Sequence, residues 1–170
     1  MTYRWIGAVL ILVGCGGFGF SMAREHRRQE RLLEALERAL KFMHWELQYR
    51  LTPLPELCNL AGRQVGGPIG SVLHQVSARL EQQTYPDVSC CMQSVLAADD
   101  VLPRQVRSLL RQLGSSLGRF DLPGQLEGLQ ALQAGCRKLL HHLEQGRGQR
   151  LRSYRTLGLC AGAALAILLL

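Results

Sequence analysis

The sequence lacks the short motifs that most catalytic and metal sites require. It has no Gly-x-x-x-x-Gly-Lys-Ser/Thr loop, so the chain is not itself a P-loop ATPase, and it has no His-Glu-x-x-His pattern. His141 and His142 are adjacent, and neighbouring positions on a helix do not face one ligand together. We therefore expect no catalytic residue, no cofactor and no metal ion, and we do not expect the chain to be an enzyme.

Disulfide signatures and aromatic residues are also scarce. The six cysteines include no Cys-x-x-Cys pair. Cys15 and Cys160 lie in apolar segments, and we interpret Cys58, Cys91 and Cys136 as small apolar packing residues in a reducing compartment. Only 6% of the residues are aromatic, and few lie among the basic residues, so the formal charge of +7 does not indicate a nucleic-acid partner.

Charge is missing from two stretches, one near each end of the chain. Ile6 to Ala23 and Leu157 to Leu170 contain no charged residue, and arginines flank the inner end of each. Positively charged flanks remain on the cytoplasmic side of a membrane. We therefore predict a membrane hairpin, in which residues 1–23 form an N-terminal transmembrane helix, 24–155 a cytoplasmic helical bundle, and 156–170 a short C-terminal transmembrane segment.

Alternatives stay open at both ends. The second apolar stretch would give about 21 Å of helix against roughly 30 Å of hydrocarbon, so a half-inserted tail competes with full spanning. Ser21-Met22-Ala23 has the composition of a signal-peptide exit, and Leu12-Val13-Gly14-Cys15 resembles a lipobox. Both of these would require export of the segment that follows. Its arginines oppose translocation, so we favour the hairpin.

The arginines that flank the two apolar stretches form what we call the membrane collar. Basic residues at this level attract anionic lipid by about 1 kcal/mol each. Small residues spaced by four in the C-terminal segment would let it pack closely on the other span or on a partner's helix, although small residues are common in membrane helices. The collar comprises Arg24, Arg27, Arg28, Arg31, Arg147, Arg150, Arg152 and Arg155, and the small residues are Gly158, Gly162 and Ala166.

Between the two ends, apolar residues recur with the helical period, and no segment alternates like a strand for long. No glycine or proline lies between Met22 and Thr52, so the first helix should continue from the span without a hinge. Because the apolar stripes can be buried only against one another, we predict an all-α fold with a bundle of about six helices. The breaks between them are expected at Pro53, Gly66–Gly67, Tyr85–Asp87, Asp99–Asp100 and Gly118–Asp121.

The first break is a stiff corner. We expect Thr52 to be the N-cap of the second helix, Pro53 to take its first position, and Glu56 to lie at its positive pole. Two prolines, Pro53 and Pro55, would fix the shape of the corner before any partner binds. The corner is therefore either a docking site or only a turn between two helices.

The last break has the residues of a structural turn. Gly114 should allow a close approach between helices, Leu117-Gly118 should stop the fifth helix, and Asp121 should cap the sixth. We assign these residues to the fold and not to binding.

Two segments carry a resemblance to a known family. They are Glu46-Leu47-Gln48-Tyr49-Arg50-Leu51-Thr52-Pro53-Leu54-Pro55-Glu56, and Gly114-Ser115-Ser116-Leu117-Gly118 with Asp121 and Gln125. Placed between an N-terminal span and a C-terminal apolar tail, they closely resemble the stage III sporulation protein AB family of endospore-forming bacteria. The resemblance covers essentially the whole chain.

The resemblance implies a scaffold in the channel complex that links mother cell and forespore. It implies a soluble domain similar to the cytoplasmic domains of F-type platform proteins of type II secretion, with partners that include a secretion-type ATPase and other channel subunits. The location implied is the mother-cell side, in the outer forespore membrane. An adaptor for an unrelated cytoplasmic enzyme is the alternative, and homo-oligomerisation stays open. The candidate docking residues are Glu46, Tyr49, Thr52, Pro53, Leu54, Pro55 and Glu56.

Overall fold

The computed structural model describes the backbone of residues 2–83, 85–99, 101–118 and 121–169, and the side chains of 25, 27–83, 85–99, 101–118 and 121–145. Across this part of the chain all regular structure is helical, and no strand forms. The all-α prediction is therefore confirmed. The six helices are α1 Thr2–Tyr49, α2 Leu54–Val65, α3 Gly67–Glu81, α4 Val88–Ala97, α5 Arg104–Ser116 and α6 Leu122–Leu169.

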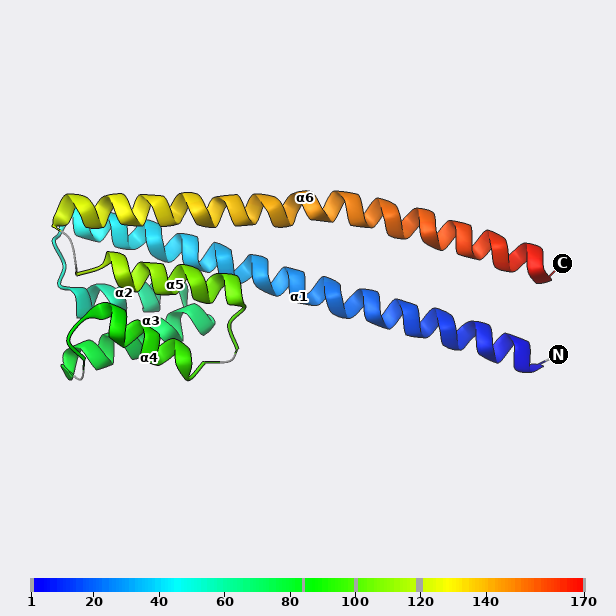
Figure 1. Cartoon of the computed structure of the whole chain (residues 1–170), viewed down its shortest axis with the longest axis horizontal. Helices are drawn as coiled ribbons and strands as arrows, with labels where there is room; N and C mark the ends of the chain where they lie inside the picture. The colour runs from blue at the N-terminus through cyan, green and yellow to red at the C-terminus, as the bar shows by residue number, and fades with distance from the viewer. Residues whose placement is uncertain (1, 84, 100, 119–120, 170) are drawn as a thin grey trace.

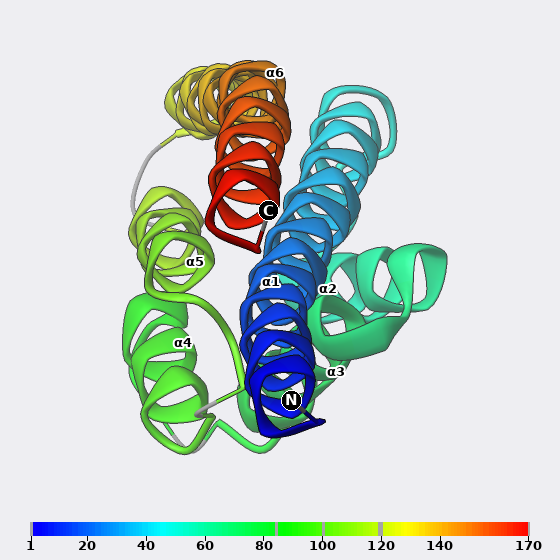
Figure 2. The ribbon, with the colours of Figure 1, turned by 90° about the vertical axis from the view of Figure 1, so that its right-hand side faces the viewer.

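Two long helices form the frame of the molecule (Figure 1). α1 and α6 have 48 residues each and lie side by side, so the N-terminus and the C-terminus lie at the same end. The four short helices pack against the other end, which we call the distal end, where α1 finishes and α6 begins. Seen along the long axis in Figure 2, α2 and α3 cover one flank of α1, and α4 and α5 lie on the other side.

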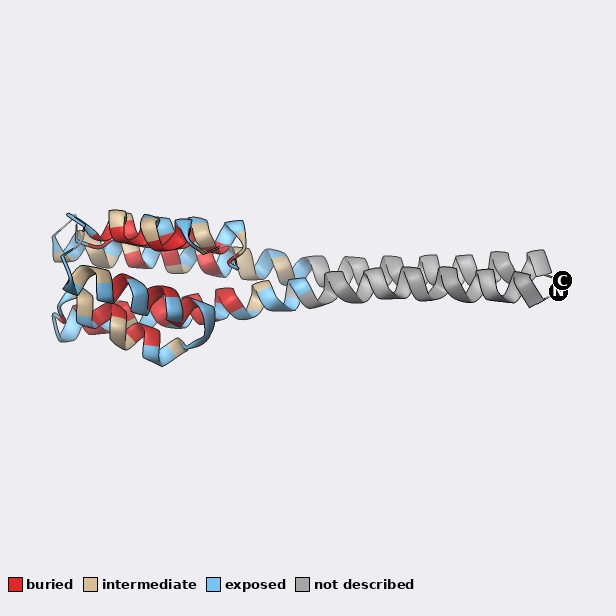
Figure 3. Cartoon of the chain, turned by 90° about the horizontal axis from the view of Figure 1, so that it is seen from below, coloured by how far each residue is buried: buried red, intermediate tan, exposed pale blue. Residues whose placement is uncertain are grey.

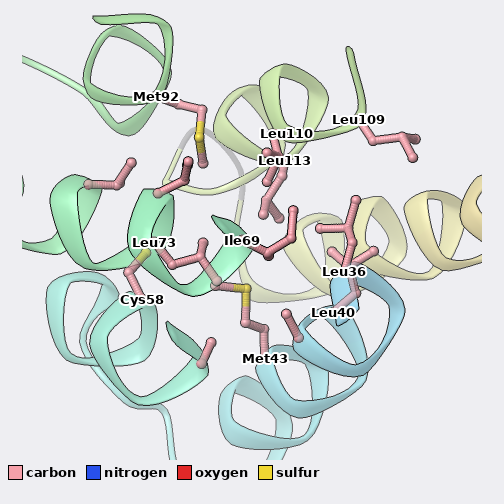
Figure 4. Close-up of a cluster of buried hydrophobic side chains, with 14 of the residues drawn as sticks. Leu36, Leu40, Met43, Cys58, Ile69, Leu73, Met92, Leu109, Leu110 and Leu113 are labelled. Carbon is pink, nitrogen blue, oxygen red and sulfur yellow. The ribbon is translucent and has the colours of Figure 1, made fainter. Parts of the chain in front are cut away.

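The core is built from the apolar stripes that define the helices. Leu36, Leu40 and Met43 recur at helical spacing on α1 and are almost fully buried. Figure 4 shows them meeting Ile69 and Leu73 of α3 beside α5. Full burial of one such side chain is worth about 1.5–3 kcal/mol, so this shared core holds the short helices on the frame. Figure 3 shows that buried residues line the facing sides of the helices where the four short helices pack against α1 and α6.

The predicted spans fall outside the described side chains. Among the residues that are described, no helix is both long enough and apolar enough to cross a membrane. Residues 1–23 and 156–170 therefore remain predictions, as do the small residues of the C-terminal segment. The same holds for Arg24, Arg147, Arg150, Arg152 and Arg155 of the collar, and for Gly158, Gly162 and Ala166.

Candidate functional site: the corner between α1 and α2

The local geometry of the corner differs from the predicted one. α2 begins at Leu54, and Pro53 is its N-cap, with φ −57° and ψ 145° and no side-chain capping bond. The prediction that Thr52 caps the helix and that Pro53 takes its first position was wrong. Pro55 occupies the first turn instead, where its missing N–H costs nothing because that donor would have no helical partner.

Thr52 has a different role, which is to pair with a buried carboxylate. Its hydroxyl donates to Oε2 of Glu46 at 2.8 Å, and the Glu46 side chain is almost completely buried. Arg50 Nη1 lies 3.6 Å from the other oxygen of Glu46, Oε1. The docking candidates Thr52 and Glu46 therefore face each other inside the corner. They would influence the binding of a partner only indirectly, through the shape of the chain between them.

That chain contains a backbone conformation that non-glycine residues rarely adopt. Leu51 has φ +53° and its side chain is 66% exposed. Such a conformation costs on the order of 1–3 kcal/mol and persists only where neighbouring contacts hold it. The Thr52–Glu46 bond and the backbone bond from Arg50 N to Glu46 O, at 2.9 Å, supply those contacts.

The outer side of the corner carries an exposed cluster that we call the distal patch, formed by Trp45, Tyr49, Arg50 and Leu51. Trp45 is 46% exposed and Tyr49 67%, and their ring centroids lie 5.8 Å apart in a tilted arrangement. The guanidinium of Arg50 lies 5.3 Å from the centroid of the Trp45 ring, within the range of a cation–π interaction. Tyr49 is one of the predicted docking residues, and the structure places Trp45, Arg50 and Leu51, which were not among the predicted ones, beside it on this surface. The available signal was the spacing of four between Trp45 and Tyr49, away from the buried stripe of α1.

The other docking candidates continue this surface around the turn. Pro53 and Glu56 are exposed, and Leu54 and Pro55 are half-buried. Glu56 lies in the first turn of α2, where its charge favours the positive pole of the helix. The structure thus gathers the candidates at one corner, with Glu46 and Thr52 beneath it.

The two segments that carry the family resemblance meet in space. Gly118 has φ +77°, and a Cβ at this position would lie 3.1 Å from Leu54 Cδ1. On the other side of the corner, the Ser77 hydroxyl of α3 donates to the carbonyl oxygen of Pro55 at 2.7 Å. The glycine turn therefore leaves room for the first residue of α2, and α3 holds the next one.

The remaining turn residues have the geometry of helix ends. α5 ends at Ser116, and Leu117 is buried with an extended backbone before Gly118. A Cβ on Gly114 would lie 2.8 Å from Met92 Cβ, so the absence of a side chain there lets α5 approach α4. Asp121 Oδ1 accepts from the backbone N of Gly124 at 3.3 Å, as an N-cap side chain does.

The described thiols are held in their protonated form. Burial raises the pKa of Cys58 to about 12 and that of Cys136 to about 11. Burial also raises the pKa of Cys91, and the hydrogen bond with Asp87 raises that of Cys90. None of these groups is an activated nucleophile, because activation requires a lowered pKa. Where side chains are described, no three His, Cys, Asp or Glu residues gather as metal ligands would.

Comparisons with known proteins agree with one another. The sequence model of the family described as stage III sporulation protein AB matches residues 4–170. Stage III sporulation protein AB of Bacillus subtilis (strain 168) is 25% identical over 169 residues, which covers 98% of this chain and 99% of that protein. A solved structure of a stage III sporulation protein AB has a TM-score of 0.63 at 20% identity and covers 72% of this chain and 98% of its own. The structural match supports the fold alone.

Proposed function

Because the chain belongs to the stage III sporulation protein AB family, which supports a role in sporulation, we propose that it is a membrane-anchored platform that docks a secretion-type ATPase. In this proposal residues 1–23 and 156–170 span the membrane on the mother-cell side, and the bundle projects into the cytoplasm. The assembly it serves is the channel complex between mother cell and forespore. Its role there is scaffolding and not catalysis.

The observation that carries this proposal is the position of the distal patch. It lies at the end of the molecule opposite both termini (Figure 1). From Ala23 to Tyr49 the helix rises by about 39 Å at roughly 1.5 Å per residue. With the termini in the membrane, the patch would therefore stand clear of the lipid headgroups. A cytoplasmic partner as large as an ATPase could reach it without contacting the bilayer.

The chemistry of the distal patch suits protein docking. Trp, Tyr and Arg are the residue types that contribute most often to binding hot spots. Here the Trp45 ring lies against both the Tyr49 ring and the Arg50 guanidinium before any partner binds. The corner behind them is held by the Thr52–Glu46 and Ser77–Pro55 hydrogen bonds. A preformed surface loses little conformational entropy on binding, so more of the contact energy appears as affinity.

The test is co-purification of the full chain from detergent-solubilised sporulating cells, with mass spectrometry of its partners. We expect a secretion-type ATPase to accompany the wild-type chain. The double variant Trp45→Ala/Tyr49→Ala should lower its recovery at least about tenfold, because hot-spot truncations cost 2 kcal/mol or more. Tyr85→Ala is the matched control, since Tyr85 is an exposed tyrosine outside the patch.

Equal ATPase recovery with the patch variant and the wild type would place docking elsewhere. Equal loss with Tyr85→Ala would mean that the patch has no special role. Recovery of an unrelated enzyme in place of the ATPase, lost only with the patch variant, would favour the adaptor alternative.

A further inference from the structure

A second surface lies at the opposite end of the bundle, nearer the predicted spans. It is a groove of about 680 Å³ between α1 and the turn that joins α2 to α3. We call it the arginine groove, because Arg27, Arg28, Arg31 and Arg38 line it and all four are exposed. Its size is that of a small-molecule site.

The charge of the arginine groove is not compensated from within. No acidic side chain is among its described lining residues, and no ion pair joins Arg27, Arg31 or Arg38 to a described carboxylate. Arg28 Nη2 donates to the neutral backbone oxygen of Val101 at 3.2 Å. Four guanidinium groups around one groove therefore favour an anionic occupant, and phosphate oxygens match the donor fork of arginine.

The turn on the other side of the groove adds to this preference. α3 begins at Gly67, with no acidic residue in its first turn and no side-chain cap, so its positive pole is not neutralised locally. A Cβ at Gly66 or Gly67 would meet nothing within 4 Å, which leaves the turn open to an incoming group. The lining also includes the buried apolar residues Leu32 and Ile69, which suit the methylene part of an amphipathic ligand.

The position along α1 distinguishes a lipid from a soluble or protein ligand. Arg27 and Arg31 lie about 6 and 12 Å beyond Ala23 along the helix axis. The headgroup layer is about 5–7 Å thick on each side of the hydrocarbon. Helical side chains point towards the N-terminus, here the membrane side, so both guanidinium groups can reach the headgroup level. Arg38 is about 22 Å beyond Ala23 and lies too far away.

We propose that the arginine groove binds the phosphate headgroup of an anionic phospholipid, with Arg27 and Arg31 as its main phosphate contacts. This proposal rests on the membrane anchoring proposed above. It assigns one defined lipid-binding site in place of a general attraction between the basic residues of the collar and anionic lipid. Bound lipid would fix the rotation of the bundle about α1 relative to the membrane surface.

The experiment uses the full chain in dodecyl maltoside, titrated with phosphatidylglycerol or phosphatidylcholine, with retained lipid counted by native mass spectrometry. We expect selective retention of phosphatidylglycerol. Arg27→Gln/Arg31→Gln should weaken its apparent Kd about twenty-five-fold, at a factor of about five for each juxtamembrane arginine. The matched double variant Arg104→Gln/Arg111→Gln removes two exposed arginines of α5 outside the groove and should shift the Kd by no more than about twofold. Arg38→Gln should have an equally small effect.

The outcomes separate this proposal from its rivals. Equal losses in the α5 variant would overturn the groove in favour of diffuse charge. If Arg38→Gln strongly weakens lipid retention, the groove binds along its whole length, which would favour an acidic protein segment as its occupant over a lipid headgroup. If inorganic phosphate displaces the lipid, the occupant would instead be a soluble anion. Circular dichroism melting of every variant verifies folding. Membrane flotation of the wild-type chain tests anchoring separately, so an anchored chain without selective lipid retention refutes only the groove.

Discussion

At the scale of single residues, the corner depends on the buried Glu46 carboxylate, whose Oε1 lies 3.6 Å from Arg50 Nη1 and whose Oε2 accepts from Thr52. Burying a charged group is costly unless it is hydrogen-bonded. The Thr52 hydroxyl meets this need at 2.8 Å, six residues further along the chain. Thr52 thus stabilises the corner by closing it over Glu46 and not by capping α2, and the exposed side chains of the distal patch are held by this buried pair.

We predict that Thr52→Val lowers the free energy of unfolding by about 1–3 kcal/mol, because it keeps the shape but leaves a buried acceptor without its donor. Thermal unfolding of the full chain in detergent, followed by far-ultraviolet circular dichroism, measures the change. Thr52→Ser retains the hydroxyl and should lose much less. Equal melting temperatures for the valine and serine variants would show that the bond contributes nothing.

At the scale of elements, helix contacts are controlled by glycines at particular crossings. A Cβ on Gly70 of α3 would lie 2.6 Å from the carbonyl oxygen of Gly62 in α2, and a backbone atom cannot move aside as a flexible side chain can. We predict that Gly70→Ala destabilises the fold by about 1–3 kcal/mol, as overpacking does.

The matched control for this prediction is Gly135→Ala in α6. The new Cβ there would meet Leu109 Cδ2 at an ordinary 3.7 Å. It should be neutral, or stabilising by up to about 1 kcal/mol through helix propensity. Urea denaturation of both variants in the same detergent compares them. A Gly70→Ala variant as stable as the wild type would contradict the close crossing of α2 and α3.

A second element-scale prediction concerns the joint between α1 and α6. Arg137 Nε of α6 bonds to Glu37 Oε1 of α1 at 2.9 Å, and Lys41 Nζ lies 2.9 Å from the same atom. The hydrogen bonds from Arg137 and Lys41 hold the pKa of Glu37 below its ordinary value of 4.5. Because the folded pKa is the lower one, the stabilisation is complete above the unfolded value and is lost as the pH falls through the folded value.

We therefore expect Glu37→Gln to melt below the wild type at neutral pH, and the difference to shrink as the pH falls below 4.5 and then through the lowered folded pKa of Glu37. Melting curves of the two chains across this range measure it. A difference that does not change with pH would mean that the ion pair is not its source.

At the scale of the whole molecule, the frame of α1 and α6 sets the separation between the two functional surfaces that we propose. The distal patch lies at one end of the bundle and the arginine groove at the other, so a partner and a lipid would bind without competing. The long helices pack side by side and are continuous from Thr2 to Tyr49 and from Leu122 to Leu169, so movement at one end would be carried to the other.

The orientation of this frame yields a topology prediction. Ser108 is exposed on α5, and we expect Ser108→Cys to react with a membrane-impermeant maleimide only after the cells are permeabilised. Cys90 is only half-buried, so the labelling is done in a Cys90→Ser chain, and Cys90→Ser without the Ser108 change is the control; Cys58, Cys91 and Cys136 are buried and react slowly. Labelling of Ser108→Cys in intact cells would reverse the proposed topology and favour export.

The elements themselves were predictable because their signals are local. The spacing of Leu36, Leu40 and Met43 placed the buried stripe of α1, and the glycine pair Gly66–Gly67 marked the turn into α3. The prediction that Thr52 caps α2 was wrong because capping propensity considers only how a residue suits the helix that follows it. Capping propensity does not consider that Glu46, six residues earlier in α1, needs a hydrogen-bond donor for its buried carboxylate.

The residue pattern alone was sufficient for the all-α class, the breaks between helices and the basic flanks of both apolar stretches, since each follows from spacing or charge within a few residues. The sites depended on contacts between distant segments. Gly118 lies against Leu54, and the turn at Gly66 lies beside the arginines of α1. Such pairings depend on how the helices pack around one core, because the free energy gained by burying apolar surface depends on all the helices together and not on any single stretch of sequence.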